Sequence, residues 1–183
     1  MPEKSPTKVV TGVVRLSYSN VWEPKSVRGG TPKYSASLII DKKDSTTITA
    51  IQAAIDAAMA NASEKIKKAP KATLKMPLKD GDEYRPSDKP YENSLFVNAL
   101  SLDPPMILDL ARNPITDKSQ VYSGCYIRAS LNFYAFDADV NKGIACGLNG
   151  IQLVRKGEPL GGRGDVSSDF ADDFTPDDED DIF

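Results

Sequence analysis

The sequence predicts a mainly β protein: a small, partly open, five-stranded barrel with one helix between its second and third strands, followed by a disordered acidic tail. Three observations predict this class. Every second residue of Gly124–Phe136 is apolar, as in a half-buried strand. Convincing helical spacing of apolar side chains occurs in Ser45–Ala69. From Asp165 onward the chain is too acidic to bury a core of its own.

The N-terminal half predicts two strands and the helix. Lys8–Trp22 is rich in β-branched residues, and the turn-rich loop Glu23–Pro32 contains adjacent glycines and two prolines. Lys33–Asp41 alternates as a strand with one apolar face. The helix begins after a capping side chain at Asp44 or the next residue and ends at Pro70. Its apolar stripe consists of Ile48, Ile51, Ile55, Met59, Ala62 and Ile66.

The C-terminal half predicts a long loop and further strands. Residues 70–93 are polar and contain five prolines or glycines, which is typical of a loop. The predicted strands are Leu95–Leu100, Met106–Leu110, Gly124–Phe136 and Gly143–Val154. A turn over Asp137–Lys142 joins the last two, and Gly147 and Gly150 indicate bulges or a bend. Five or so strands with this helix placement fit a barrel of the OB type.

The second face of Gly124–Phe136 carries candidate binding residues. It consists of Tyr126, Arg128, Ser130, Asn132, Tyr134 and Phe136. An outward face usually presents Lys, Glu and Thr, whereas this one presents aromatic rings, an arginine and small hydrogen-bonding groups. Aromatic rings stack on exposed bases and arginine pairs with phosphate, which is the chemistry of single-strand binding. The alternative is that this face lies under the helix or the long loop.

A second group of candidate residues lies between Trp22 and Lys33. The basic residues Lys25, Arg28 and Lys33 accompany the sole tryptophan there, at a binding-loop position of OB-type barrels. The alternative is an ordinary mobile loop. The predicted DNA-binding residues are therefore Trp22, Lys25, Arg28, Lys33, Tyr126, Arg128, Asn132 and Tyr134.

Lysines also cluster at the end of the predicted helix. They are Lys65, Lys67, Lys68, Lys71 and Lys75. The cluster could hold phosphates, but the favoured interpretation is that its first members complement the helix dipole and stay solvated.

Charge divides the chain into two parts. Residues 165–183 hold nine of the 26 acidic residues and none of the 23 basic ones, so residues 1–164 carry a net charge of +6 while the whole chain carries -3. A cationic body favours phosphate backbones, and an anionic tail can compete for the same surface. We therefore predict a nucleic-acid-binding domain over residues 1–164 and a disordered tail over residues 165–183.

The end of the tail predicts a protein partner. Its acidic residues are followed by two apolar ones, which suits docking into an apolar pocket with a basic rim. The predicted partner-binding residues are Asp177, Asp178, Glu179, Asp180, Asp181, Ile182 and Phe183. A purely solubilising tail is the alternative, and it leaves the apolar end unexplained.

Several short motifs in order resemble a known family. They are Lys33–Ser35, Tyr122–Tyr126, Asn132–Phe136, Lys142–Gln152 and Gly157–Gly161. Together they resemble a bacteriophage single-stranded DNA-binding protein family with an OB-fold, and the match covers most of residues 8–162. The tail is similar to the acidic tails of bacterial and phage single-stranded DNA-binding proteins, which recruit replication and repair partners. It departs from the usual bacterial ending because no proline precedes Phe183.

Other function classes find little support. The chain has no histidine, which excludes His-based triads and His-metal sites, and it has no Gly-rich phosphate loop ending in Lys-Ser/Thr. We therefore predict no enzymatic activity, no cofactor and no metal. No run approaches 18 apolar residues and the start of the chain lacks a signal region, so we expect a cytoplasmic protein, in a bacterial host if it is phage-encoded.

The predicted function is to coat single-stranded DNA during phage replication or recombination. The predicted partners are single-stranded DNA and, through the tail, replication or recombination proteins; a homo-oligomer is left open. The alternative from another class is a DNA mimic or interaction module that inhibits a host nuclease. A nuclease built from carboxylates is a third hypothesis, but the dense acids lie in the tail, where catalytic geometry cannot be held.

The two cysteines are predicted to be buried free thiols. A turn centred near Asp139 places Cys125 opposite the region of Leu153, and Cys146 opposite that of Asn132. They are then not cross-strand partners, which is consistent with a reducing compartment.

Overall fold

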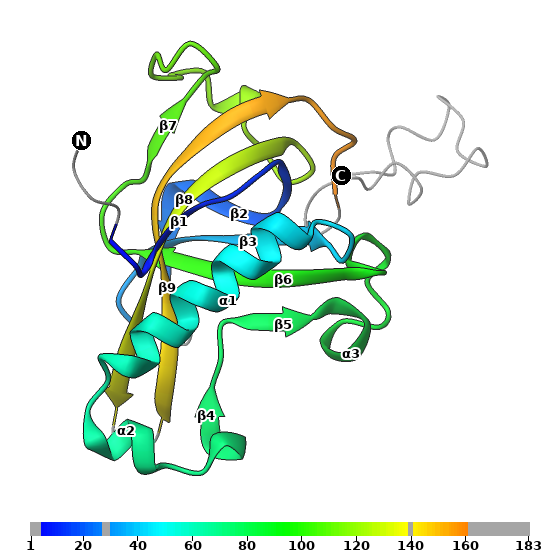
Figure 1. Ribbon diagram of the computed structural model, residues 1–183. Coiled ribbons are helices and arrows are strands. Elements are labelled where there is room, and N and C mark those ends of the chain that lie inside the picture. Colours follow the sequence, from blue (N-terminus) through cyan, green and yellow to red (C-terminus); the bar gives the residue numbers. More distant parts are fainter. Residues whose placement is uncertain (1–4, 27–29, 139–140, 161–183) are drawn as a thin grey trace, which may run out of the picture.

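Five strands close into a ring around the core. The computed structural model describes residues 5–26, 30–138 and 141–160. The ring consists of β2 (Val14–Lys25), β3 (Lys33–Asp41), β6 (Ser94–Ser101), β9 (Asn141–Arg155) and β8 (Tyr126–Ala138), which pairs again with β2 (Figure 1). Neighbouring strands are antiparallel except β6 and β9, which are parallel. The ring is only partly closed, because β2 pairs with β8 at two positions and then leaves it.

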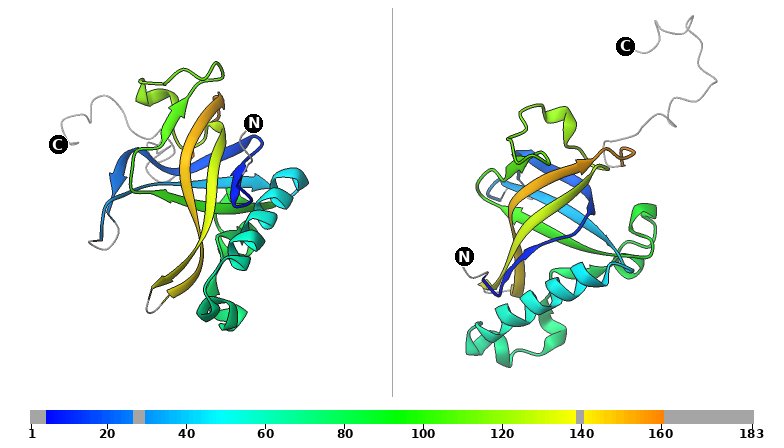
Figure 2. Two further views of the ribbon diagram at one scale, coloured as in Figure 1. Left: turned by 60° about the vertical axis from the view of Figure 1, so that its left-hand side comes forward. Right: turned by 45° about the horizontal axis from the view of Figure 1, so that its top comes forward.

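The inner faces of these strands make the core. On β8 the side chains of Ile127, Ala129, Leu131 and Phe133 are at most 2% exposed, which confirms the predicted alternation. The helix α1 (Ser45–Ala60) lies across one end of the ring (Figure 2). It contributes Ile51, Ala54, Ile55 and Ala58 to the same core. Apolar burial on one face of each element therefore holds the ring and the helix together.

The single predicted helix is two helices in the structure. Asp44 caps α1 as predicted, because its carboxylate accepts a first-turn N–H at 3.2 Å. Helix α1 ends at Ala60 with Asn61 as its C-terminal cap, and α2 (Glu64–Lys68) follows. There Ile66 packs with Leu74 in a small cluster of its own. In the described ranges no helix is long and apolar enough to cross a membrane.

The first predicted strand is also interrupted. β1 (Lys8–Val10) ends before Thr11, whose backbone N–H donates to the Ala129 carbonyl and whose hydroxyl accepts the Ala129 N–H, both at 2.9 Å. The N–H of Gly12 then donates to the hydroxyl of Thr47 on α1 at 3.0 Å. These bonds interrupt the strand, so β1 and β2 pair one after the other with the same edge of β8, while β9 occupies its other edge. β2 ends at Lys25 and not at Trp22, so the loop that follows it is shorter than predicted.

Residues 70–93, predicted as one long loop, contain short elements. They are η1 (Lys71–Thr73), β4 (Leu74–Lys75), β5 (Leu78–Asp80), α3 (Gly81–Tyr84) and η2 (Lys89–Tyr91). β4 pairs with β9, and β5 pairs with β6. Tyr91 is fully buried, lies edge-on to Phe96 at 5.0 Å between ring centroids, and donates its hydroxyl to Ser37 at 2.7 Å. The loop prediction was wrong because a buried aromatic pair and strand pairing hold this segment.

The pairing of β8 with β9 is the longest in the sheet. It runs from Tyr126 opposite Arg155 to Ala138 opposite Asn141, and residues 139–140 lie outside the described part. A register shift near Gly150 confirms the bulge that the glycines of this strand predicted. β7 (Met106–Leu108) pairs in parallel with β9, and η3 (Lys118–Gln120) follows it. The predicted acidic tail lies outside the described residues.

Both cysteines are buried and free, as predicted. Cys146 lies opposite Phe133, one residue from the predicted partner, and Cys125 precedes β8. The partner of Cys146 differs from the prediction because Ala138 pairs with Asn141, which centres the hairpin half a residue beyond Asp139; the register shifts lie further along, between Ser130 and Leu131 and between Tyr126 and Ile127. Burial raises the pKa of both thiols, so the reactive thiolate is scarce at neutral pH.

We expect the folded protein to resist alkylation by iodoacetamide at pH 7.5, because both thiols are buried and protonated. Mass spectrometry should find both cysteines modified only after unfolding in guanidinium chloride. Rapid modification of either thiol in the folded protein would contradict this description of the core.

Candidate nucleic-acid interface

The outward face of β8 forms a strip along one side of the ring. We call it the β8 strip, and it consists of Tyr126, Arg128, Ser130, Asn132, Tyr134 and Phe136. Tyr134 is 44% exposed, Arg128 is exposed, and the other four side chains are partly exposed. This face therefore reaches solvent, as predicted, instead of lying under the helix or the segment 70–93.

Two arginines flank the Tyr126 ring at one end of the strip. The guanidinium carbon of Arg155 lies 4.1 Å from the ring centroid, and that of Arg15 lies 5.5 Å from it. Both arginines stand on strands next to β8, opposite Tyr126 in the register. Arg15 also donates to the carbonyls of Gly124 and Glu158, at 3.1 and 2.7 Å. This end of the strip thus combines an aromatic ring with two cations, which suits a base and its phosphates.

The centre of the strip presents hydrogen-bonding groups. The Nε of Arg128 donates to the carbonyl of Thr11 at 3.1 Å, which fixes an otherwise exposed guanidinium. Asn132 lies opposite Gly147, where an added Cβ would come within 2.6 Å of the Asn132 Oδ1. Glycine at this position therefore leaves room for the Asn132 amide. On the other side of β8, Lys8 of β1 is opposite Asn132 and adds a further cation.

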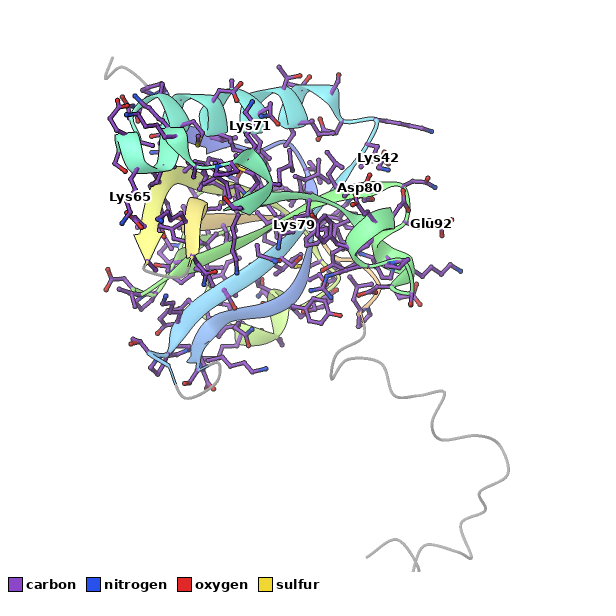
Figure 3. All side chains as sticks on the ribbon, turned by 90° about the horizontal axis from the view of Figure 1, so that it is seen from below. Lys42, Lys65, Lys71, Lys79, Asp80 and Glu92 are labelled. Atoms are coloured by element: carbon purple, nitrogen blue, oxygen red, sulfur yellow. The ribbon has the colours of Figure 1, made fainter. Side chains whose placement is uncertain are left out.

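Lysines gather beyond the Tyr134 end of the strip, where the β8–β9 hairpin ends. An open pocket of about 500 Å³ is lined by Lys65, Lys68, Ala69, Pro70, Thr73 and Lys142. The Nζ of Lys65 lies 3.9 Å from the Asp137 carboxylate of β8, and Figure 3 shows Lys65 beside the hairpin. Part of the predicted lysine cluster thus extends the cationic surface of the strip, besides lying in the last turn of α2.

The other predicted residues stand on the β2–β3 hairpin, which projects in a different direction from the β8–β9 hairpin (Figure 2). Trp22 belongs to β2 and not to the loop; it packs against the main core and donates its indole N–H to the Val121 carbonyl at 3.0 Å. Lys25 and Lys33 are exposed and opposite each other, and Arg28 lies outside the described residues. The structure therefore separates this group from the four predicted residues on β8, and its contacts with DNA stay a prediction.

Sequence reasoning missed a pocket on the outer side of β2. It has a volume of about 450 Å³ and is lined by Ser17, Tyr18, Tyr84, Arg85, Pro86, Ser87, Asp88, Pro90 and Leu160. The guanidinium carbon of Arg85 lies 4.8 Å from the ring centroid of Tyr18 and 5.1 Å from that of Tyr91. The Tyr18 hydroxyl donates to Asp88 at 2.9 Å, and burial together with this bond raises the pKa of Tyr18. The sequence signal for this pocket is the pair of adjacent residues Tyr84 and Arg85, in the segment predicted as a loop.

A partly closed ring of five strands with a cationic, aromatic outer face is typical of proteins that bind nucleic acids. Among the described residues no three acidic or cysteine side chains gather so as to hold a metal. The chain matches the family described as "Enterobacter phage Enc34, ssDNA-binding protein" over residues 7–183, and it belongs to that family. Membership of this phage family of single-stranded DNA-binding proteins confirms the predicted non-enzymatic class.

The chain is also similar in sequence to a phage relative and in fold to solved phage proteins. A protein designated p50 of Acyrthosiphon pisum secondary endosymbiont phage 1 is 30% identical, over 96% of this chain and 98% of the relative. The single-stranded DNA-binding protein of bacteriophage Enc34, solved in complex with ssDNA, has the same fold, with a TM-score of 0.76 and 22% identity over 87% of this chain and 97% of that one. The fold is also that of the bacteriophage T7 single-stranded DNA-binding protein gp2.5, with a TM-score of 0.61 and 15% identity over 92% and 95% of the two chains.

We expect Gly157→Ala to destabilise the fold by about 1–3 kcal/mol, the usual cost of overpacking. The added Cβ would meet the Gly124 carbonyl, and would lie 2.9 Å from Cε2 of Tyr126. Urea unfolding measures the loss. Gly147→Ala is the control, with a smaller loss, because its nearest neighbour is the Asn132 side chain, which can rotate. Equal stability of Gly157→Ala and the parent would contradict the packing at this end of the strip.

Proposed function

We propose that the chain binds single-stranded DNA along the β8 strip and coats strands exposed during phage replication or recombination. The observation that carries the proposal is the alternation of β8, which buries one face and presents rings and an arginine on the other. Family membership and the likeness in fold to a protein solved with ssDNA support it. Base stacking on such rings contributes about 1–3 kcal/mol per base and tolerates any sequence.

We infer that the ring is an OB-fold over residues 1–164. Its strand pairing supports this: the first strand, β2, meets the second and fourth, and α1 follows the second strand. OB-folds bind oligonucleotides on the face of strands two and three and with the loops between strands one and two and between strands four and five. Here those loops follow Lys25, on β2, and Ala138, at the Tyr134 end of the strip. Both predicted groups of binding residues thus adjoin a loop of this kind.

In this proposal, DNA binding combines the attraction of phosphates to cations with the stacking of bases on aromatic rings. The Tyr126 end contributes Arg15 and Arg155, and the centre contributes Arg128 and Lys8. Cations that pair with phosphates release counterions, so affinity falls as salt rises. A net charge of +6 over residues 1–164 favours DNA binding over the DNA-mimic alternative, because a mimic needs an acidic surface.

We further propose that residues 165–183 are a tail with two separate roles. The nine carboxylates compete with DNA for the cationic body, and Ile182 and Phe183 dock into a pocket of a replication or recombination protein. The composition of this segment supports the proposal. Its acidic residues can compete with DNA for the cationic body, whereas its apolar end cannot and therefore needs another role.

For the strip, we expect Tyr134→Ala to weaken binding to oligo(dT) by about 1–3 kcal/mol, because a stacking ring is lost. Tyr134→Phe keeps the ring and should bind like the parent. Arg128→Ala should weaken binding and flatten the slope of log affinity against log salt by about 0.7, the value for one phosphate contact. Fluorescence anisotropy at several salt concentrations measures all three.

The charge control for Arg128→Ala is Lys43→Ala, which removes one positive charge from the exposed turn before α1. It should leave the salt slope unchanged. If both Tyr134→Ala and Arg128→Ala bind oligo(dT) as tightly as the parent protein, DNA binds on another surface.

For the tail, deleting Asp165–Phe183 should raise affinity for ssDNA at low salt, since nine competing charges are removed, and the gain should shrink as salt rises. Deleting only Ile182 and Phe183 keeps every side-chain charge. This shorter deletion should leave DNA affinity nearly unchanged and abolish capture of a replication or recombination protein in a pull-down. An equal effect of both deletions on DNA binding would refute the division of roles.

A further inference from the structure

The pocket beside β2 has an unusual residue in its wall. Tyr18 adopts a left-handed backbone conformation with φ of 45°, which is uncommon for a tyrosine and costs free energy. Its side chain is nevertheless 44% exposed, so the apolar ring is not held there by complete burial. Strained positions of this kind cluster at ligand-binding sites. Arg85 lies over this ring and Tyr91 is tilted against it, at 6.3 Å between ring centroids, so only the remaining exposed part of the ring borders the pocket.

The guanidinium of Arg85 forms a second part of the pocket and is only partly hydrogen-bonded: its Nη1 donates to the Tyr18 hydroxyl at 3.5 Å. It is packed among the rings of Tyr18, Tyr91 and Phe96, at 4.8, 5.1 and 5.5 Å. Its Nε is buried and has no hydrogen-bond partner within the part of the chain that the structure describes. Within the same ranges no carboxylate forms an ion pair with it. The buried Nε is out of reach, but a ligand that brings acceptor atoms to the terminal N–H groups of Arg85 in the pocket wall would stabilise the guanidinium.

The carboxylate of Asp88 decides which ligand fits. It accepts the Tyr18 hydroxyl at 2.9 Å and lines the same pocket as Arg85. A carboxylate repels phosphate, whereas the edge of a nucleobase carries both donors, for Asp88, and acceptors, for Arg85. A ring for stacking beside one donor and one acceptor therefore matches a base better than a phosphate. The volume of about 450 Å³ falls within the range of small-ligand pockets.

We propose that this pocket, the Tyr18 pocket, binds one nucleobase of the single strand, stacked on Tyr18 with its edge toward Arg85 and Asp88. The proposal rests on the proposed function and adds a contact outside the β8 strip. The two are joined by one segment: Leu160 lines the pocket, and the preceding Glu158 accepts a hydrogen bond from Arg15 beside the Tyr126 ring. A strand bound at the Tyr126 end can therefore continue across this segment into the pocket.

The test compares Tyr18→Leu with Tyr18→Phe on two strands of equal length. One is oligo(dT), and the other is an abasic deoxyribose-phosphate strand with the same phosphates and no bases. Tyr18→Leu should weaken binding to oligo(dT) about 5- to 150-fold, the loss expected for one stacked base, with an unchanged salt slope. Tyr18→Phe should bind oligo(dT) like the parent. Neither variant should differ from the parent on the abasic strand.

A second measurement needs no variant. Ultraviolet crosslinking of the parent protein to an oligonucleotide with 5-iodouracil, followed by mass spectrometry, should modify Tyr18. The inference is overturned if Tyr18 is not crosslinked, if Tyr18→Leu binds oligo(dT) like the parent, or if it loses equal affinity for the abasic strand. If Tyr134→Ala weakens binding to oligo(dT) and Tyr18→Leu does not, the proposal for the Tyr18 pocket is refuted while that for the β8 strip is kept. Failure of the parent to bind either strand would refute the proposed function itself.

Discussion

The pairing of β8 with β9 is the interaction on which both the ring and the strip depend. It holds β8 along its whole length, from Tyr126 to Ala138, whereas β2 holds β8 at only two positions. Side chains alternate along a paired strand, so Ile127 enters the core while its neighbour Arg128 faces solvent. A slip of one residue would exchange the two faces and bury the rings and the guanidinium. The register that stabilises the core therefore also sets the chemistry of the outer face.

Register explains the electrostatics of the strip as well. Arg15, Arg155 and Lys8 belong to three different strands, and each is opposite a residue of β8 that faces outward. The cations are thus assembled by strand pairing and not by a basic run in the sequence. The cations that give residues 1–164 their net charge of +6 are spread along the sequence, while nine of the 26 acidic residues are concentrated in residues 165–183. This arrangement lets an exposed surface attract phosphate in a chain that is acidic as a whole.

The elements that could be predicted are those that depend on local pattern. The alternation of β8, the cap at Asp44 and the outward face with Tyr126 and Tyr134 follow from residue spacing alone. The break at Gly12 could not be predicted, because it depends on a bond to Thr47 on α1. The Tyr18 pocket could not either, since it joins residues near positions 18, 85 and 160 of the chain. Features that depend on contacts between distant segments cannot be predicted from the local pattern of residues in a single sequence.

Whether bases contact the outer face of β8 can be measured from amide chemical shifts during a titration with oligo(dT). We expect the largest changes along Tyr126–Ala138 and at the cross-strand positions Arg15 and Arg155, which flank the Tyr126 ring. The exposed side of α1, at Gln52 and Asp56, should remain unchanged. Saturable binding with shifts confined to the β2–β3 hairpin or to α1, and none on β8, would show that DNA binds to another face of the ring.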